Sequence, residues 1–276
     1  MKYDLAAMAR RQINIRRKSI TIRDIAPPAV LASDLYAAGY RPVLALIDRY
    51  AAQASAEYDR SLTALITDSG DDLTSIFERM GQELSALVLL LRPSLRDWTV
   101  RVERYQRGKW RGAVLAASNV DIDTMIGPQD VAVTLETALN WNVALVRDVG
   151  EQARQRISAA VFAGLTNRSP ARDVAKQIRE ATGFARDRSL RIASDQLTKL
   201  SSSLAEERQR QAGITTVEWR SSHKLHFRPH HQARDGKVYD LDSRAPVDGG
   251  EAVAADDWAG KPPFCGCRTL ARISFE

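Results

Sequence analysis

Cysteine and histidine are rare in this sequence, which has two cysteines and four histidines among 276 residues. So few cysteines exclude a disulfide-stapled secreted scaffold and fit a reducing compartment. Long apolar runs are also lacking, because the longest, Leu84 to Leu91, is too short to cross a membrane. The charged N-terminus predicts no secretory signal. We therefore expect a cytoplasmic chain with one or two cores and no membrane partner.

The soft metal ligands that the sequence does contain lie together in one short region. Thiolate and imidazole are the ligands that zinc prefers in tetrahedral structural sites. The clustering therefore predicts a structural zinc site rather than the inert thiols and solvated histidines that are more usual in a cytosolic chain. The clustered residues are His223, His226, His230, His231, Cys265 and Cys267.

Spacing selects candidate ligands within this cluster. Side chains two residues apart in an extended segment point to the same side, and Gly266 between the cysteines allows the backbone to kink. His231 precedes an Asp-Gly turn that reverses the chain. A disulfide across so tight a ring is disfavoured. The expected ligands are Cys265, Cys267 and His231, with the fourth position left open between His226, which is preferred, and His230 or Asp235.

Positive charge is concentrated at the N-terminus of a chain whose net charge is +6 and whose pI is about 9.5. Residues 1–26 are expected to form a basic arm that lies along nucleic-acid phosphates or plugs into a partner. A solvated terminus is the competing interpretation, and alternating isoleucines favour addition of the arm as a strand to a neighbour. The candidate nucleic-acid contacts are Arg10, Arg11, Arg16, Arg17 and Lys18.

Residues 27–185 show the three- and four-residue spacing of helices and are expected to form a helical body. The stretch near residues 95–117 mixes aromatics with arginines, which favours buried aromatics and solvated arginines over a nucleic-acid clamp. Pro93 and Gly183 are expected to end helices. The expected helices run from Pro27 to about Ser69, from there to about Leu91, from about Leu95 to Ala117, onward from a loop at 119–128, from Pro170 to Gly183, and from about Arg186 to Ala212.

Beyond Gly213 the period of the apolar residues changes to two, which predicts a strand-rich unit. This unit is too small to be stable without zinc or packing on the helices. The predicted fold class is therefore mainly α, with a helical body and a small α+β C-terminal module that zinc staples together. The predicted domains are 1–26, 27–185 and 186–276.

Several short motifs follow one another in this last region, and their residues are Asp195, Gln196, Trp219, Arg228, Pro229, His231, Asp235, Gly236, Cys265, Cys267 and Arg268. In order and spacing these motifs resemble the Mu-type F protein family, the phage minor head or head morphogenesis family. The resemblance begins near Arg186. Two departures are the histidine-containing stretch 223–226, where an acidic run is usual, and an insert at 246–258.

The resemblance implies a non-enzymatic minor head protein of a tailed bacteriophage that acts in head assembly at or near the portal vertex. The implied partners are the portal or major capsid protein, packaged double-stranded DNA, and further copies of the chain around the portal. The implied location is the virion head, and the host cytoplasm during assembly.

A metal-dependent hydrolase, such as a nuclease, is the competing function. A zinc deaminase is disfavoured because Gln232 and Ala233 follow His231 where its signature needs a glutamate. A nuclease needs an open metal position and a general base, which another histidine of the cluster could supply. A cysteine nucleophile has no support from the Cys-Gly-Cys spacing.

Overall fold

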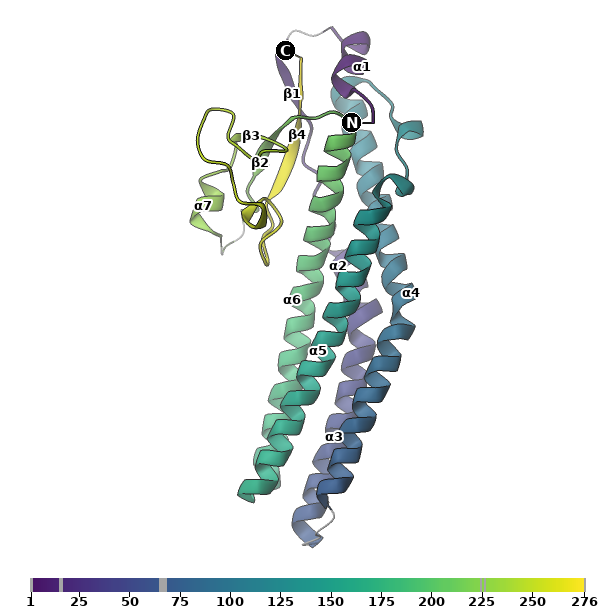
Figure 1. Ribbon diagram of the computed structural model, residues 1–276, viewed down its shortest axis with the longest axis vertical. Coiled ribbons are helices and arrows are strands. Elements are labelled where there is room, and N and C mark those ends of the chain that lie inside the picture. Colours follow the sequence, from purple (N-terminus) through teal and green to yellow (C-terminus); the bar gives the residue numbers. More distant parts are fainter. Residues whose placement is uncertain (1, 15–16, 65–68, 224, 226, 276) are drawn as a thin grey trace. The chain divides into compact units, whose positions relative to one another are not determined.

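A computed structural model describes residues 2–14, 17–64, 69–223, 225 and 227–275. The protein is mainly helical and has a small antiparallel sheet, as the sequence predicts (Figure 1). Three 3-10 turns are Asp123–Met125, Pro128–Val131 and Ala255–Asp257, and a π-helical turn is Tyr36–Tyr40. The helices are α1 (Leu5–Gln12), α2 (Val30–Leu35), α3 (Arg41–Ala64), α4 (Ser69–Ser118), α5 (Ala132–Asn167), α6 (Ala171–Gln211) and α7 (Pro229–Gln232); the strands are β1 (Ser19–Thr21), β2 (Thr216–Arg220), β3 (Val238–Asp240) and β4 (Arg268–Ser274).

The chain forms two compact units. We call Met1–Leu31, Thr99–Ala138 and Ser194–Glu276 the sheet unit, and Ala32–Trp98 with Leu139–Ala193 the bundle unit. N-terminal and C-terminal residues therefore share one unit, whereas the division at residues 26 and 185 stays a prediction about domains.

The bundle unit packs parts of four helices side by side, α3, α4, α5 and α6 (Figure 1). Glycines allow the helices to approach closely: a Cβ on Gly150 would lie 2.5 Å from Leu84, and one on Gly164 would lie 2.5 Å from Val174. The Tyr58 hydroxyl donates a hydrogen bond of 2.7 Å to a backbone carbonyl that precedes α6. The side chains of these helices are therefore closely packed where the glycines lie.

Two expected helix ends are wrong, because α4 continues through Pro93 and α6 continues through Gly183. A proline inside a helix costs about 3 kcal/mol, and a glycine costs about 1 kcal/mol. Burial of apolar side chains outweighs these costs, because the buried positions continue at three- and four-residue steps on both sides of Pro93 and of Gly183. Along α4 they are Leu84, Val88, Leu91, Leu95, Trp98 and Val102, and along α6 they include Val174, Ile178, Ala181, Ala185, Ser189 and Ile192.

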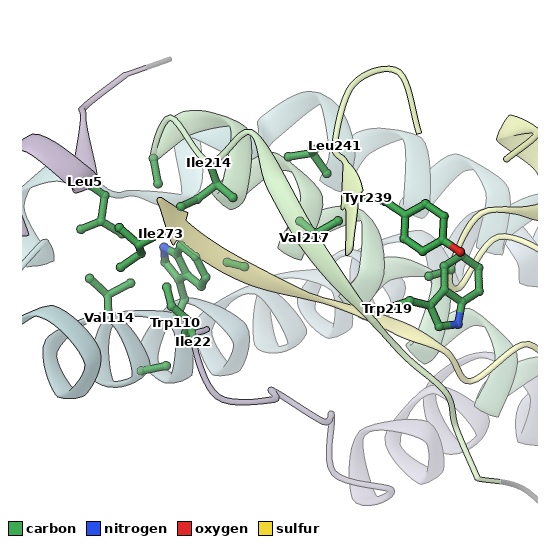
Figure 2. Close-up of a cluster of buried hydrophobic side chains, with 14 of the residues drawn as sticks. Leu5, Ile22, Trp110, Val114, Ile214, Val217, Trp219, Tyr239, Leu241 and Ile273 are labelled. Carbon is green, nitrogen blue, oxygen red and sulfur yellow. The ribbon is translucent and has the colours of Figure 1, made fainter. Parts of the chain in front are cut away.

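The sheet unit contains the four antiparallel strands in the order β1-β4-β2-β3. The N-terminal β1 pairs with β4 of its own chain, with Ser19 opposite Ser274, so the strand addition expected of the arm occurs within the chain. Figure 2 shows Leu5 and Ile22 from the N-terminal segment in the core with Trp110 of α4.

A buried ion-pair network joins the helices of the sheet unit. Arg208 is fully buried. Its Nη2 donates to Oε1 of Glu103 over 3.0 Å and to the carbonyl oxygen of Gly127 over 2.8 Å. Because every partner lies inside the unit, this network fixes how α4 and α6 meet there.

One helical stretch, Val30–Leu62, is long and apolar enough by length and composition to cross a membrane, with a mean hydropathy of 1.2 in its most apolar window. The expectation from sequence concerned uninterrupted apolar runs, whereas this stretch includes charged residues such as Asp34 and Asp48. About 44% of the window is buried inside the structure. Core helices of bundles pass the same test, so this stretch is weak evidence for a membrane span.

Candidate metal centre

His231 lies on the short helix α7, which begins at Pro229. The following turn contains Gly236, whose φ of +76° favours glycine. The backbone N–H of Gly236 donates to the carbonyl oxygen of Trp219 over 2.8 Å, and Asp235 Oδ1 accepts from the backbone N–H of Ser221 over 2.7 Å. The Asp-Gly turn thus ties α7 to β2.

The two cysteines lie in the loop that leads into β4. Asp195 of α6 accepts a hydrogen bond of 2.6 Å from the backbone N–H of Phe264, and its other oxygen pairs with Lys199 over 2.9 Å. Arg228 donates to the carbonyl oxygen of Pro263 over 3.0 Å. Asp195 and Arg228 therefore hold this loop, a role that sequence reasoning did not assign to either.

The structure brings together three predicted ligands, which are His231, Cys265 and Cys267, and all three are buried. His231 Nδ1 is 3.5 Å from Cys265 Sγ and 3.6 Å from Cys267 Sγ. A sulfur at about 2.3 Å and a nitrogen at about 2.0–2.1 Å from one tetrahedral zinc ion lie about 3.6 Å apart. The donor types and their spacing therefore fit a tetrahedral metal ion.

The other nitrogen of His231 faces a carboxylate that the sequence analysis did not single out. His231 Nε2 is 2.9 Å from Asp257 Oδ1, and Arg234 Nη1 donates to Asp257 Oδ2 over 2.7 Å. Burial opposes ionisation, but hydrogen bonds from His231, Arg234 and His230 outweigh it and hold the pKa of Asp257 below its usual range. An ionised Asp257 accepts a hydrogen bond from the Nε2–H of His231, which leaves the lone pair of Nδ1 facing the thiols.

The two thiols influence each other's ionisation. A hydrogen bond from Cys267 lowers the pKa of Cys265 to about 5, and backbone N–H groups of Cys267 and Gly260 add to this effect. The same interaction, with burial and the neighbouring charge, raises the pKa of Cys267. The pair therefore retains one proton readily, and a bound cation would allow both sulfurs to ionise.

The described alternatives for the fourth position, His230 and Asp235, do not join this cluster. His226 lies outside the described residues. His230 is exposed and lies 3.3 Å from Asp257 Oδ1, forming a second group of potential ligands with His231 and Asp257. His223 Nε2 is instead 3.5 Å from Asp235 Oδ2. Among the described residues, the thiol group therefore has three ligands.

Three other motif residues, Trp219, Gln196 and Arg268, lie outside the thiol cluster and are buried or hydrogen-bonded near it. Trp219 is fully buried, with its ring 5.2 Å from that of His231 and edge-on to it. Gln196 is buried in α6. Arg268 Nε donates to Asp24 Oδ1 over 2.7 Å, and its Nη1 donates to the carbonyl oxygen of Gly266 over 3.2 Å. The residue after the second cysteine thus also anchors the N-terminal segment.

The predicted nucleic-acid contacts lie in the sheet unit, away from the thiol cluster in sequence. Arg10 and Arg11 are exposed at the end of α1, and Arg17 and Lys18 are exposed just before β1. Arg16 lies outside the described residues. Their role in binding nucleic acid stays a prediction.

Fold and site define a helical protein with a small α+β module that carries a potential metal centre. Residues 155–270 match the family described as "Phage Mu protein F like protein". This match confirms the predicted resemblance to the Mu-type F family.

A further comparison found an uncharacterized protein of Haemophilus influenzae (strain ATCC 51907 / DSM 11121 / KW20 / Rd) that is 27% identical over 107 residues. The match covers 39% of this chain and 24% of that protein, so the chain spans about a quarter of its relative. No solved structure matches the chain.

Proposed function

We propose that this protein is a non-enzymatic minor head protein of a tailed bacteriophage, that it acts in head assembly at or near the portal vertex, and that a structural zinc ion holds its C-terminal module together. The observation that carries the proposal is the position of the thiol cluster within the segment that matches the Mu F-like family. Its partners would be the portal or major capsid protein, packaged DNA and further copies around the portal.

Mass spectrometry of purified, DNA-filled particles tests the head assignment. A fixed ratio of this chain to portal subunits is the expected result. Its absence from mature particles, with presence in assembly intermediates or free in the lysate, would contradict a built-in head component and favour a transient assembly factor.

Metal analysis of the purified full-length chain tests the zinc assignment. One zinc per chain is expected, and Cys265→Ser with Cys267→Ser should abolish it and lower the melting temperature of the sheet unit. Wild-type protein that purifies without metal, together with an unchanged melting temperature in the double variant, would contradict the structural role of zinc.

A metal-dependent hydrolase is the second candidate. Catalytic zinc sites combine three protein ligands with one open position, and three ligands are found here among the described residues. An open pocket of about 500 Å³ is lined by residues that include His230 and Asp257. Zinc-dependent cleavage of DNA by the wild type but not by the double cysteine variant would favour this candidate over the structural role.

A further inference from the structure

Backbone hydrogen bonds close one of the two edges of the sheet. At the β3 edge, the N–H of Asp240 donates to the carbonyl oxygen of Ala245 over 2.9 Å, and the N–H of Val247 donates to that of Val238 over 2.9 Å. Pro246, which lies between Ala245 and Val247, has no N–H to offer another strand. Edges that are covered by a loop or carry proline resist pairing with other chains. The β3 edge is therefore protected.

The other edge of the sheet is formed by β1 and is open. The N–H of Ile22 donates to the carbonyl oxygen of Ala271 over 2.8 Å, so the even-numbered residues of this segment bond to β4. Hydrogen-bonded pairs alternate along an antiparallel ladder, so Ser19 and Thr21 direct their backbone N–H and C=O groups away from β4. Among the described residues, none forms a hydrogen bond with these outward groups, which we call the β1 edge.

Cationic side chains surround the β1 edge. Arg17 and Arg23 are exposed, one before Ser19 and one after Thr21. Arg272 of β4 lies opposite Thr21, and its Nε donates to the hydroxyl oxygen of Ser19 over 2.8 Å. A guanidinium group keeps its charge at any physiological pH, so these three arginines make the surroundings of the edge positive.

The carboxylates near the β1 edge already have partners. Asp24 Oδ1 accepts a hydrogen bond of 2.7 Å from Arg268 Nε. Glu218 of β2 accepts a hydrogen bond of 3.4 Å from the hydroxyl group of Thr21. Positive charge therefore exceeds negative charge beside the edge, and this favours an acidic partner.

The alternation of side chains along β1 sets the pattern of a partner strand. Ile22 is buried in the core (Figure 2), and Ile20 lies on the same face of the sheet. Ser19 and Thr21 lie on the opposite face, which is also that of Arg272. Side chains that face each other on neighbouring strands share one face. A strand added at the β1 edge would therefore place apolar side chains beside Ile20 and acidic side chains near Arg272.

We infer that the β1 edge accepts an extended segment of a partner protein in which acidic and apolar residues alternate. The edge offers both donors and acceptors, which a peptide backbone matches and a phosphate backbone, with acceptors alone, does not. A second copy fits less well, because antiparallel pairing through both Ser19 and Thr21 would place Arg17 of each copy opposite Arg23 of the other. The inference goes beyond the proposed function and holds whether or not the partner is a head protein.

Fluorescence anisotropy with the full-length chain tests the inference, and the probe is a labelled short peptide that alternates glutamate and valine. Thr21→Pro removes an outward N–H but none of the donors that bond to β4. One net backbone hydrogen bond corresponds to about a fivefold change in an equilibrium constant, so this variant should bind the peptide at least fivefold more weakly. Thr21→Val is the matched control, because it loses the same hydroxyl group and keeps the N–H, and it should bind like the wild type.

A second pair of variants tests the contribution of charge. Arg17→Gln with Arg23→Gln should weaken binding of the peptide, and more so at low salt. Lys176→Gln with Arg179→Gln is the control, since both residues are exposed in the bundle unit, and it should leave binding unchanged. Equal binding by the two double variants would overturn the acidic preference, as would a lysine–valine peptide that binds as tightly as the glutamate–valine peptide.

Amide hydrogen exchange of the wild type locates the peptide even where Thr21→Pro disturbs β1. The amides of Ser19 and Thr21 should gain protection when the peptide is added, whereas that of Ile22 is already bonded to β4. The inference is overturned if the peptide does not bind, if it leaves these two amides unprotected, or if Thr21→Pro binds like Thr21→Val. Protection of the same amides by duplex DNA, or by raising the concentration of the chain without peptide, would assign the edge to another occupant and also overturn it.

Discussion

Asp257→Asn should weaken metal binding without removing a ligand. The Asp257 carboxylate accepts the hydrogen bond from His231 Nε2 over 2.9 Å and so orients Nδ1 toward the thiols. Loss of such an outer partner typically lowers metal affinity by about 10–100-fold. That change corresponds to about 1.4–2.8 kcal/mol of binding free energy.

Competition with a chromophoric zinc chelator, with the full-length chain, measures this effect. Asp256→Asn is the matched control, since it makes the same charge change on the exposed neighbouring residue. Asparagine at 257 also removes the ion pair with Arg234, which spans 2.7 Å. Unfolding of the metal-free variants separates the two effects, because the ion pair acts with or without metal. Equal zinc affinity in the two variants would refute the orienting role of Asp257.

Urea unfolding tests four further substitutions, two that probe helix packing in the bundle unit and two that probe the buried ion pair of the sheet unit. Gly164→Ala should destabilise the bundle unit, because overpacking against Val174 costs about 1–3 kcal/mol. Gly183→Ala, with open space around it, should stabilise the same unit by about 0.5–1 kcal/mol. Similar effects of the two substitutions would contradict the close approach of Gly164 to Val174. Arg208→Met should cost about 3 kcal/mol, near the low end for a broken buried pair because Glu103 keeps an ion pair within α4. Adding Glu103→Leu should recover most of that loss, and simple additivity would show that the pair is not coupled.

The sequence allowed prediction of the fold class from helical spacing, and of three clustered potential ligands because histidine and cysteine are confined to one region. Three- and four-residue spacing identified the apolar faces of the helices, and the short Cys-Gly-Cys segment placed two sulfurs together. The expected helix ends at Pro93 and Gly183 were wrong because the proline and the glycine were considered without the helical spacing of the apolar residues on both sides of them. The buried positions keep the same three- and four-residue spacing across Pro93 and across Gly183. This continuous spacing could have been recognised in the sequence.

Contacts that no rare residue type or motif marks were beyond the reach of such patterns. Asp257 lies in an insert with its own composition, and nothing in its neighbours predicts that it meets His231, 26 residues away in the sequence. The N-terminal strand pairs with β4 over more than 250 residues, since Ser19 lies opposite Ser274. Only the folded backbone brings these groups together.

The position of the thiol cluster explains why so small a sheet would depend on it. His231 lies between β2 and β3, and the two cysteines end just before β4, so a metal ion would join segments that flank three of the four strands. Arg268 starts β4 and also binds Asp24, next to the segment that forms β1. A metal that fixes the loop before Arg268 would therefore stabilise the pairing of β4 with both β1 and β2. Strands of three to seven residues have little independent stability. A metal ion bound by the cluster would therefore stabilise the sheet by holding the segments next to β2, β3 and β4 in place.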